Sequence, residues 1–141
     1  MKNFLLPALL LGGMAAMAQS VTFTEDIAPI IYNKCTSCHR PGEIAPFPLT
    51  NYTEVANRAL SIELVTQSGY MPPWPPDPEY THLVGERVLS AQEKQLIVDW
   101  VQQGTPEGDP ALEPPLPNFP SGSVLGVPDL VLSMAESYTT N

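Results

Sequence analysis

The spacing of apolar residues predicts a first helix near the start of the chain. One apolar stripe recurs at spacings of three and four: Ile27, Ile30, Ile31, Cys35 and Cys38. Asp26 can cap this helix with Ile27 as its first residue. Pro29 falls in the first turn, where its missing N–H is tolerated. The pattern therefore predicts an amphipathic helix that carries two cysteines at its end.

A second helix is predicted after residue 50. Asn51 followed by Glu54 makes a capping box in its asparagine variant, and Ser68-Gly69 ends the pattern. The apolar stripe of this helix comprises Tyr52, Val55, Ala59 and Ile62.

The third helix has the strongest signals. Ser90 and Glu93 form a capping box, and Gly104 is a typical helix stop. Its inward face consists of Leu96, Ile97, Trp100 and Val101.

Proline-rich stretches separate and follow these helices. Residues 41–50 are expected to form an irregular loop, and residues 71–78 a stiff extended one, because prolines lack N–H donors and fix φ. Beyond Pro106 the composition shifts to Pro, Gly, Glu and Asp, which is typical of a linker or a tail laid over a domain. Within that tail, residues 130–132 have the character of a short strand. The expected fold is all-α, with a Pro-rich C-terminal extension.

The amino terminus resembles a secretory signal peptide in its build. Lys2 precedes an apolar stretch that is too short to cross a bilayer, and a small-residue ending at Ala18 follows. We expect a signal peptide over 1–18 and an exported, periplasmic chain without a membrane span; a retained membrane anchor is the alternative. Removing Lys2 changes the formal charge from −9 to −10, which disfavours nucleic acid and anionic membrane surfaces as partners.

Cys35-Thr36-Ser37-Cys38-His39 carries the chemistry of the chain. Two thiols on one helical face can add to the vinyl groups of haem, and the adjacent imidazole of His39 can ligate the iron. A disulfide across this spacing would close almost no loop. Zinc would need every Cys and His in the chain, and a thioredoxin-like dithiol normally follows a β-strand. The motif therefore predicts one covalently attached haem c with its iron.

A sixth iron ligand is expected in an electron carrier. The candidates are Met71, His82 and, more remotely, Met134. We favour Met71, because it precedes Pro72 and belongs to a stiff loop that has little ordering entropy left to lose. A gap-filling methionine, ligation by His82 and an open site remain the alternatives.

Three motifs support a family resemblance. Residues 38–47, 71–74 and 100–110 together resemble the cytochrome domain that begins certain bacterial exported proteins, several of which continue into a copper type II ascorbate-dependent monooxygenase-like domain. More broadly, residues 23–110 resemble a class I cytochrome c-like domain. The resemblance implies haem attachment at Cys35 and Cys38, His39 as proximal ligand and Met71 as distal ligand.

The predicted organisation is a signal peptide over 1–18, a haem domain over 19–110 and a Pro-rich linker or tail over 111–141. The predicted function is electron transfer between redox protein partners by an exported monohaem c-type cytochrome, which is not itself an enzyme. A copper monooxygenase-like domain is one candidate partner. The alternatives are a five-coordinate or His82-ligated sensor or accessory module, and a haem domain with only a structural role.

Five further side chains are candidates for secondary roles. Two tryptophans could pack near the haem edge and three arginines could pair with a propionate, although core packing and solvated surface charge explain all five better: Trp74, Trp100, Arg40, Arg58 and Arg87.

Overall fold

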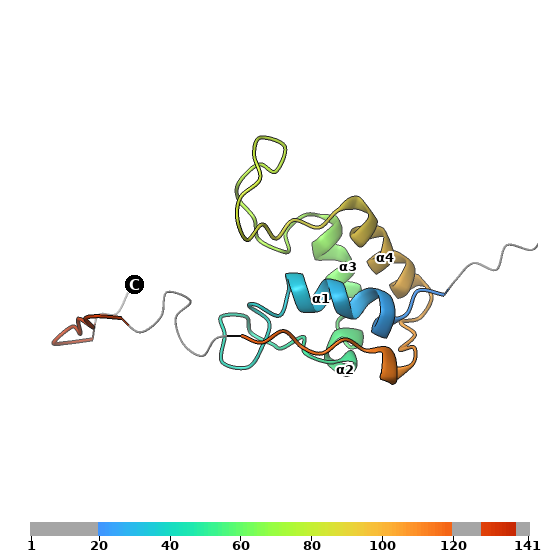
Figure 1. Cartoon of the computed structure of the whole chain (residues 1–141), viewed down its shortest axis with the longest axis horizontal. Helices are drawn as coiled ribbons and strands as arrows, with labels where there is room; N and C mark the ends of the chain where they lie inside the picture. Colours follow the sequence, from blue (N-terminus) through green and yellow to red (C-terminus); the bar gives the residue numbers. More distant parts are fainter. Residues whose placement is uncertain (1–19, 120–127, 138–141) are drawn as a thin grey trace, which may run out of the picture.

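The computed structural model describes residues 20–119 and 128–137, so the predicted signal peptide lies outside the described residues. The described residues form a small all-helical domain with four α-helices and no strands among them (Figure 1). The α-helices are α1 (Ala28–Lys34), α2 (Tyr52–Ala56), α3 (Ala59–Gln67) and α4 (Ala91–Gln102). A π-helical turn, η1 (Phe23–Ile27), precedes α1, and a short 3₁₀-helix, η2 (Pro110–Leu112), follows α4. The expectation of a strand at residues 130–132 was wrong: these residues are exposed and form no regular secondary structure.

The first helical segment begins earlier than the sequence predicted. Thr22, rather than Asp26, is the N-cap, and its hydroxyl accepts a hydrogen bond from the Glu25 amide at 3.4 Å. The Asp26 carboxylate instead accepts a hydrogen bond from the Thr22 amide at 2.8 Å. Pro29 falls in the first turn of α1, as predicted. The π-helical geometry of η1 arises because the Ile27 and Ala28 amides donate to the carbonyls of Thr22 and Phe23, five residues earlier in each case.

The predicted second helix is two helices. Asn51 caps α2 as expected by accepting from the Glu54 amide at 3.0 Å, but the Glu54 carboxylate binds the Thr50 amide rather than that of Asn51. The helix breaks at Asn57 and Arg58, which separate α2 from α3. Asparagine is a weak helix former, and the buried residues on both sides of the break, Val55 and Ala59, belong to the same hydrophobic core.

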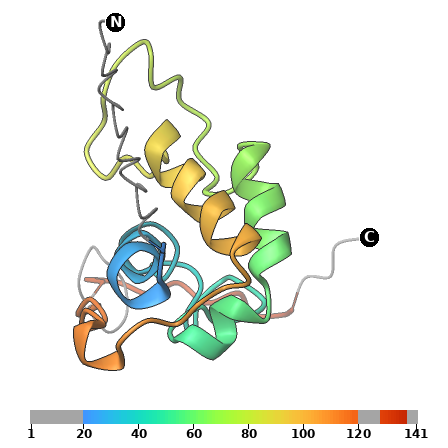
Figure 2. The ribbon, with the colours of Figure 1, turned by 90° about the vertical axis from the view of Figure 1, so that its right-hand side faces the viewer.

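Helix α4 agrees with its prediction. Both halves of the Ser90–Glu93 capping box form, at 3.1 and 2.7 Å. Ile97 and Trp100 are buried, and the chain leaves the helix through Gly104 at φ 82°. In Figure 2, α4 lies beside α3, and these two helices pack against each other.

The hydrophobic core gathers buried residues from η1 and from α1, α2, α3 and α4. Phe23 sits at its centre, with aromatic neighbours Tyr32, Tyr52 and Trp100 at ring-centroid distances of 5.5–6.2 Å. The segment after α4 closes this core: the Pro106 carbonyl accepts from the Phe23 amide and from Trp100 Nε1, both at 2.9 Å. Buried backbone amides of η1 thus find partners that helix geometry alone would not supply.

The chain after η2 runs back along α1 (Figure 1). Tyr32 donates a hydrogen bond to the Glu113 carboxylate, and the Arg40 guanidinium lies 4.1 Å from the centre of the Phe119 ring. The first part of the Pro-rich extension therefore lies over the domain, as one of the two sequence-based interpretations expected. Among the described residues, no helix has the length and hydropathy needed to cross a bilayer.

Candidate functional site

The two cysteines and His39 lie in the turn that follows α1. The Cys35 amide donates to Ile31 at 2.8 Å, which extends the helical hydrogen bonding of α1, and the His39 amide donates to the Cys35 carbonyl at 2.9 Å. This extra helical turn projects the motif from the helix end, as the spacing predicted. Both cysteines are free thiols.

A cavity of about 500 Å³ opens beside this turn. Cys35, Cys38, His39 and Met71 all line it, and the rest of its wall is mostly apolar. Residues from α3 and the flanking loops complete the wall: Leu49, Ile62, Val65, Tyr70, Pro72 and Pro73. The volume falls within the range of about 300–1,000 Å³ that small-molecule and cofactor sites usually have. We call it the cysteine cavity.

His39 is oriented by a backbone acceptor. Its Nδ1 lies 3.1 Å from the Phe47 carbonyl oxygen, and the His39 and Phe47 rings have a centroid distance of 4.8 Å with their planes tilted by 44°. Because a carbonyl can only accept, Nδ1 carries the hydrogen and Nε2 keeps a free lone pair. Metal-bound histidines are commonly oriented in this way. The sequence analysis did not identify Phe47 as part of the site, since a carbonyl acceptor has no side-chain signature.

Met71 lies far from the cysteines in sequence and is held against the end of α3. Its amide donates to the Val65 carbonyl at 3.0 Å, and its side chain lines the cavity reached by the cysteines and His39. The structure thus brings the motif and the predicted distal methionine to one cavity.

The other candidate iron ligands lie elsewhere. The His82 side chain is 84% exposed, lies 3.0 Å from the Glu86 carboxylate and is absent from the cavity wall. Met134 is 75% exposed.

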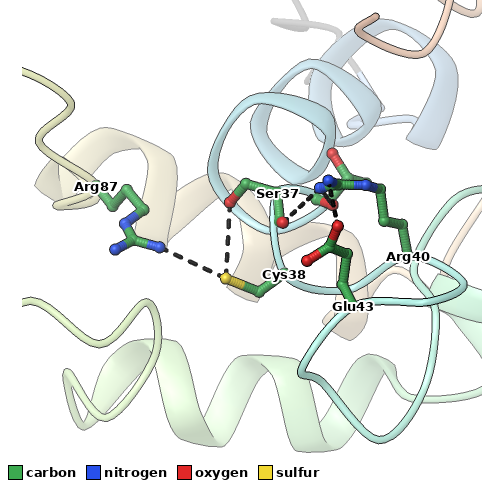
Figure 3. A network of polar contacts seen from close by, with 6 residues as sticks. Ser37, Cys38, Arg40, Glu43 and Arg87 are labelled. Atoms are coloured by element: carbon green, nitrogen blue, oxygen red, sulfur yellow. Dashed lines mark hydrogen bonds and ion pairs between the residues drawn. The ribbon is translucent and has the colours of Figure 1, made fainter. Parts of the chain in front are cut away.

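The secondary candidates divide between the cavity and the rest of the domain. Arg58 and Arg87 line the cavity, and Arg87 Nη1 lies 3.5 Å from Cys38 Sγ (Figure 3). Arg40 instead pairs with Glu43 at 2.6 Å. Trp100 is a core residue, and Trp74 lines a separate cavity of about 170 Å³.

Burial raises the pKa of the Cys35 thiol to about 12, with further contributions from Cys38 and Glu93. In the free chain this thiol is therefore neutral at physiological pH. Among the residues that the structure describes, no three His, Cys, Asp or Glu side chains gather as a metal site. A neutral thioether fits this apolar wall better than a thiolate does.

Comparison with known proteins found no matching family model, curated protein or solved structure.

Proposed function

We propose that the chain is an exported monohaem c-type cytochrome that carries one electron between redox protein partners. Cys35 and Cys38 would hold haem c through thioether bonds, with His39 and Met71 as the two iron ligands. The observation that carries this proposal is that one apolar cavity is lined by two thiols, an imidazole and a thioether. These are the groups that covalent attachment and His/Met ligation require.

When bound, haem supplies a one-electron ferric–ferrous couple. The chain's own residues have three tasks around it. The Phe47 carbonyl holds the His39 ring in the tautomer with Nε2 free. The Met71 thioether would be a weak donor to the iron, which would raise the reduction potential relative to two imidazole ligands. With haem bound, the apolar part of the wall would limit the access of water to the iron.

The finer fold assignment follows from the same proposal. Within the all-helical domain, we propose a class I cytochrome c-like arrangement over 19–110, in which a motif-bearing helix, a Met-Pro segment and a closing helix surround the haem. A periplasmic location agrees with the predicted signal peptide. By the resemblance of residues 38–47, 71–74 and 100–110, a copper monooxygenase-like domain is one candidate partner.

Covalent attachment is the first test. The full chain is expressed with a c-type cytochrome maturation system, and we expect haem staining that survives denaturing electrophoresis. Changing both cysteines to alanine should abolish the stain, while each single change should leave one thioether at most. Unstained wild-type protein, at normal expression, would overturn the proposal.

Ligation of the iron is the second test. We expect a weak near-infrared methionine–iron band that is lost in Met71→Ala and kept in His82→Ala, because only Met71 lines the cavity. Met134→Ala is a second control on an exposed methionine. Ready carbon monoxide binding by the ferrous wild type at neutral pH would favour the sensor alternative instead. Reduced protein that never passes electrons to any supplied oxidant would favour a structural haem domain.

A further inference from the structure

The Pro-rich extension contacts the chain on both sides of the cysteine motif. Upstream, the Glu113 carboxylate accepts a hydrogen bond from Tyr32, which lies three residues before the motif begins. Downstream, the Arg40 guanidinium lies 4.1 Å from the centre of the Phe119 ring, and Arg40 follows the motif directly. We call residues 113–119 the strap. Its two contacts therefore bracket the five residues that carry the chemistry of the chain.

Arg40 is the side chain through which the end of the strap reaches the motif turn. Its Nη1 donates to the carbonyls of Thr36 and Ser37, at 3.3 and 2.5 Å. Its Nη2 pairs with the Glu43 carboxylate at 2.6 Å, and Figure 3 shows Arg40 reaching both Ser37 and Glu43. Carbonyls at the end of a helix have no partner within the helix. Arg40 therefore closes the turn that follows α1, and Phe119 lies against its guanidinium.

The contact at Glu113 fixes the last turns of α1. Tyr32 is 3% exposed, and its hydroxyl donates to both the Glu113 carboxylate and the Thr50 carbonyl. Burial and the hydrogen bond to Glu113 raise the pKa of Tyr32 above its usual range, so the phenol keeps its proton and continues to donate. The Tyr32 carbonyl in turn accepts from the buried Thr36 hydroxyl, within the motif. Each contact of the strap thus reaches the motif through one intervening residue.

The motif turn benefits from such support because it borders an open cavity. Cys38 and His39 both line the cysteine cavity, and atoms beside a cavity lack packing partners on that side. Tyr32, Arg40 and the strap all belong to the described part of the chain and are not among the residues that line the cavity. The strap can therefore restrain the turn without occupying the space left for a ligand.

We propose that the strap is a positioning element, which holds the turn of residues 35–39 in one arrangement through Phe119 and Arg40. Phe119 restrains the guanidinium, and the guanidinium restrains the carbonyls of the turn. The inference rests on the proposed function for the role of the motif, but the contacts themselves require no haem. It assigns a task to a segment whose composition indicates only a linker or a tail.

The test measures local opening of the motif turn in the full chain as purified. Amide hydrogen exchange of Cys38 and His39, followed by NMR in the reduced protein, reports on the turn, and the amides of α4 report on global opening. We expect Phe119→Ala to speed exchange of the two turn amides by about threefold relative to α4, as for a partly exposed cation–π contact. Phe119→Tyr keeps the ring face and should restore wild-type exchange. The matched control, Leu116→Ala, removes an exposed apolar side chain of the strap and should leave the ratio unchanged.

Variants of Arg40 test whether Phe119 acts through this side chain. Arg40→Gln should speed exchange of the turn amides by about tenfold, because the charge-assisted hydrogen bonds to the two carbonyls are lost. Arg40→Lys keeps the charge but not the planar fork, so it should not restore wild-type exchange. In the Arg40→Gln background, Phe119→Ala should add little, whereas two independent structural contributions would multiply.

Unchanged turn exchange in Phe119→Ala would overturn the inference, as would multiplying effects in the double variant. Wild-type turn amides that exchange as fast as those of an unfolded chain would also overturn it. Covalent haem staining is measured separately, so a stained protein without this coupling would lose only the positioning role of the strap. An unstained protein that shows the coupling would keep the strap and lose the proposed function.

Discussion

The packed core and the cysteine cavity are neighbouring apolar regions of this domain that differ in how completely they are filled. The packed core, formed by Phe23, Ile27, Ile97 and Trp100, is filled by the chain's own side chains, each 1% exposed or less. The cysteine cavity is walled by similar apolar residues, yet about 500 Å³ within it is open. The chain fills one apolar region with its own side chains, whereas the other contains an open cavity.

This difference suggests that the packed core mainly determines folding stability, whereas the cavity mainly determines ligand binding. In the packed core, Trp100 Nε1 and the Phe23 amide both donate to the Pro106 carbonyl, whereas the buried Thr24 hydroxyl has no hydrogen-bond partner. Atoms that line an open cavity lack van der Waals partners on one side, so binding a ligand there should stabilise the fold. Changes in the packed core should therefore act on folding with or without ligand, whereas changes around the cavity should act through the ligand.

The largest expected effect comes from opening the packed core. Trp100→Ala removes a fully buried ring and its hydrogen bond to Pro106, and should lower the free energy of unfolding by about 4 kcal/mol. Urea unfolding followed by circular dichroism measures the change. Trp74→Ala, in the loop beside the small cavity, is the matched control and should cost much less. Equal losses for the two variants would contradict the division drawn above.

The next effect tests how closely the segment after α4 approaches the packed core. A Cβ added at Gly108 would lie 2.8 Å from Thr22 Cβ and still closer to Thr24 Oγ1, and Gly108 has φ 88°. Gly108→Ala should therefore cost about 3 kcal/mol. Gly104 has a similar φ of 82° but open space around its Cβ position, so Gly104→Ala isolates the backbone cost at about 1 kcal/mol. Thermal unfolding of both variants compares them, and a larger loss at Gly104 would refute the close-packing argument.

An intermediate effect should arise at the cavity wall and depend on pH. Because the folded pKa of Cys35 is raised to about 12 from an ordinary value of about 8.5, the unfolded thiol ionises first. Stability of the haem-free chain should be full below pH ~8.5 and fall by about 1 kcal/mol per unit between pH ~8.5 and 10. Cys35→Ala should flatten this slope, whereas Cys38→Ala should retain most of it. Urea unfolding at several pH values measures the slope, and an unchanged slope in Cys35→Ala would rule out this origin.

The smallest effect lies at the start of α4, which contributes to the packed core through Ile97 and Trp100. Ser90→Ala removes one half of the capping box and should cost about 1 kcal/mol. Ser68→Ala, at the exposed C-cap of α3, should be nearly neutral. Hydrogen exchange of the first amides of α4 should speed up only in the Ser90 variant; protection that stays at the wild-type level would show that the cap is dispensable.

The sequence predicted the helices best where local signals agreed. For α4, the capping box, the apolar spacing and Gly104 all pointed to the same boundaries. The prediction of the first helix was wrong at its start. Asp26 was taken as the N-cap, whereas Thr22 caps the π-helical turn that precedes α1. The prediction also merged α2 and α3, because the apolar spacing continues across Asn57 and Arg58 despite the break.

The motif at residues 35–39, Met71 as a ligand candidate and the all-helical class were determined by the sequence alone. These depend on residue type and on neighbours within a turn or two, which short-range physics governs. Tertiary structure decided that Met71 shares a cavity with the cysteines while His82 does not, and that the Phe47 carbonyl orients His39. It also placed Arg58 and Arg87, but not Arg40, at that cavity. Such placements depend on how distant segments pack, and neither residue spacing nor composition encodes them locally.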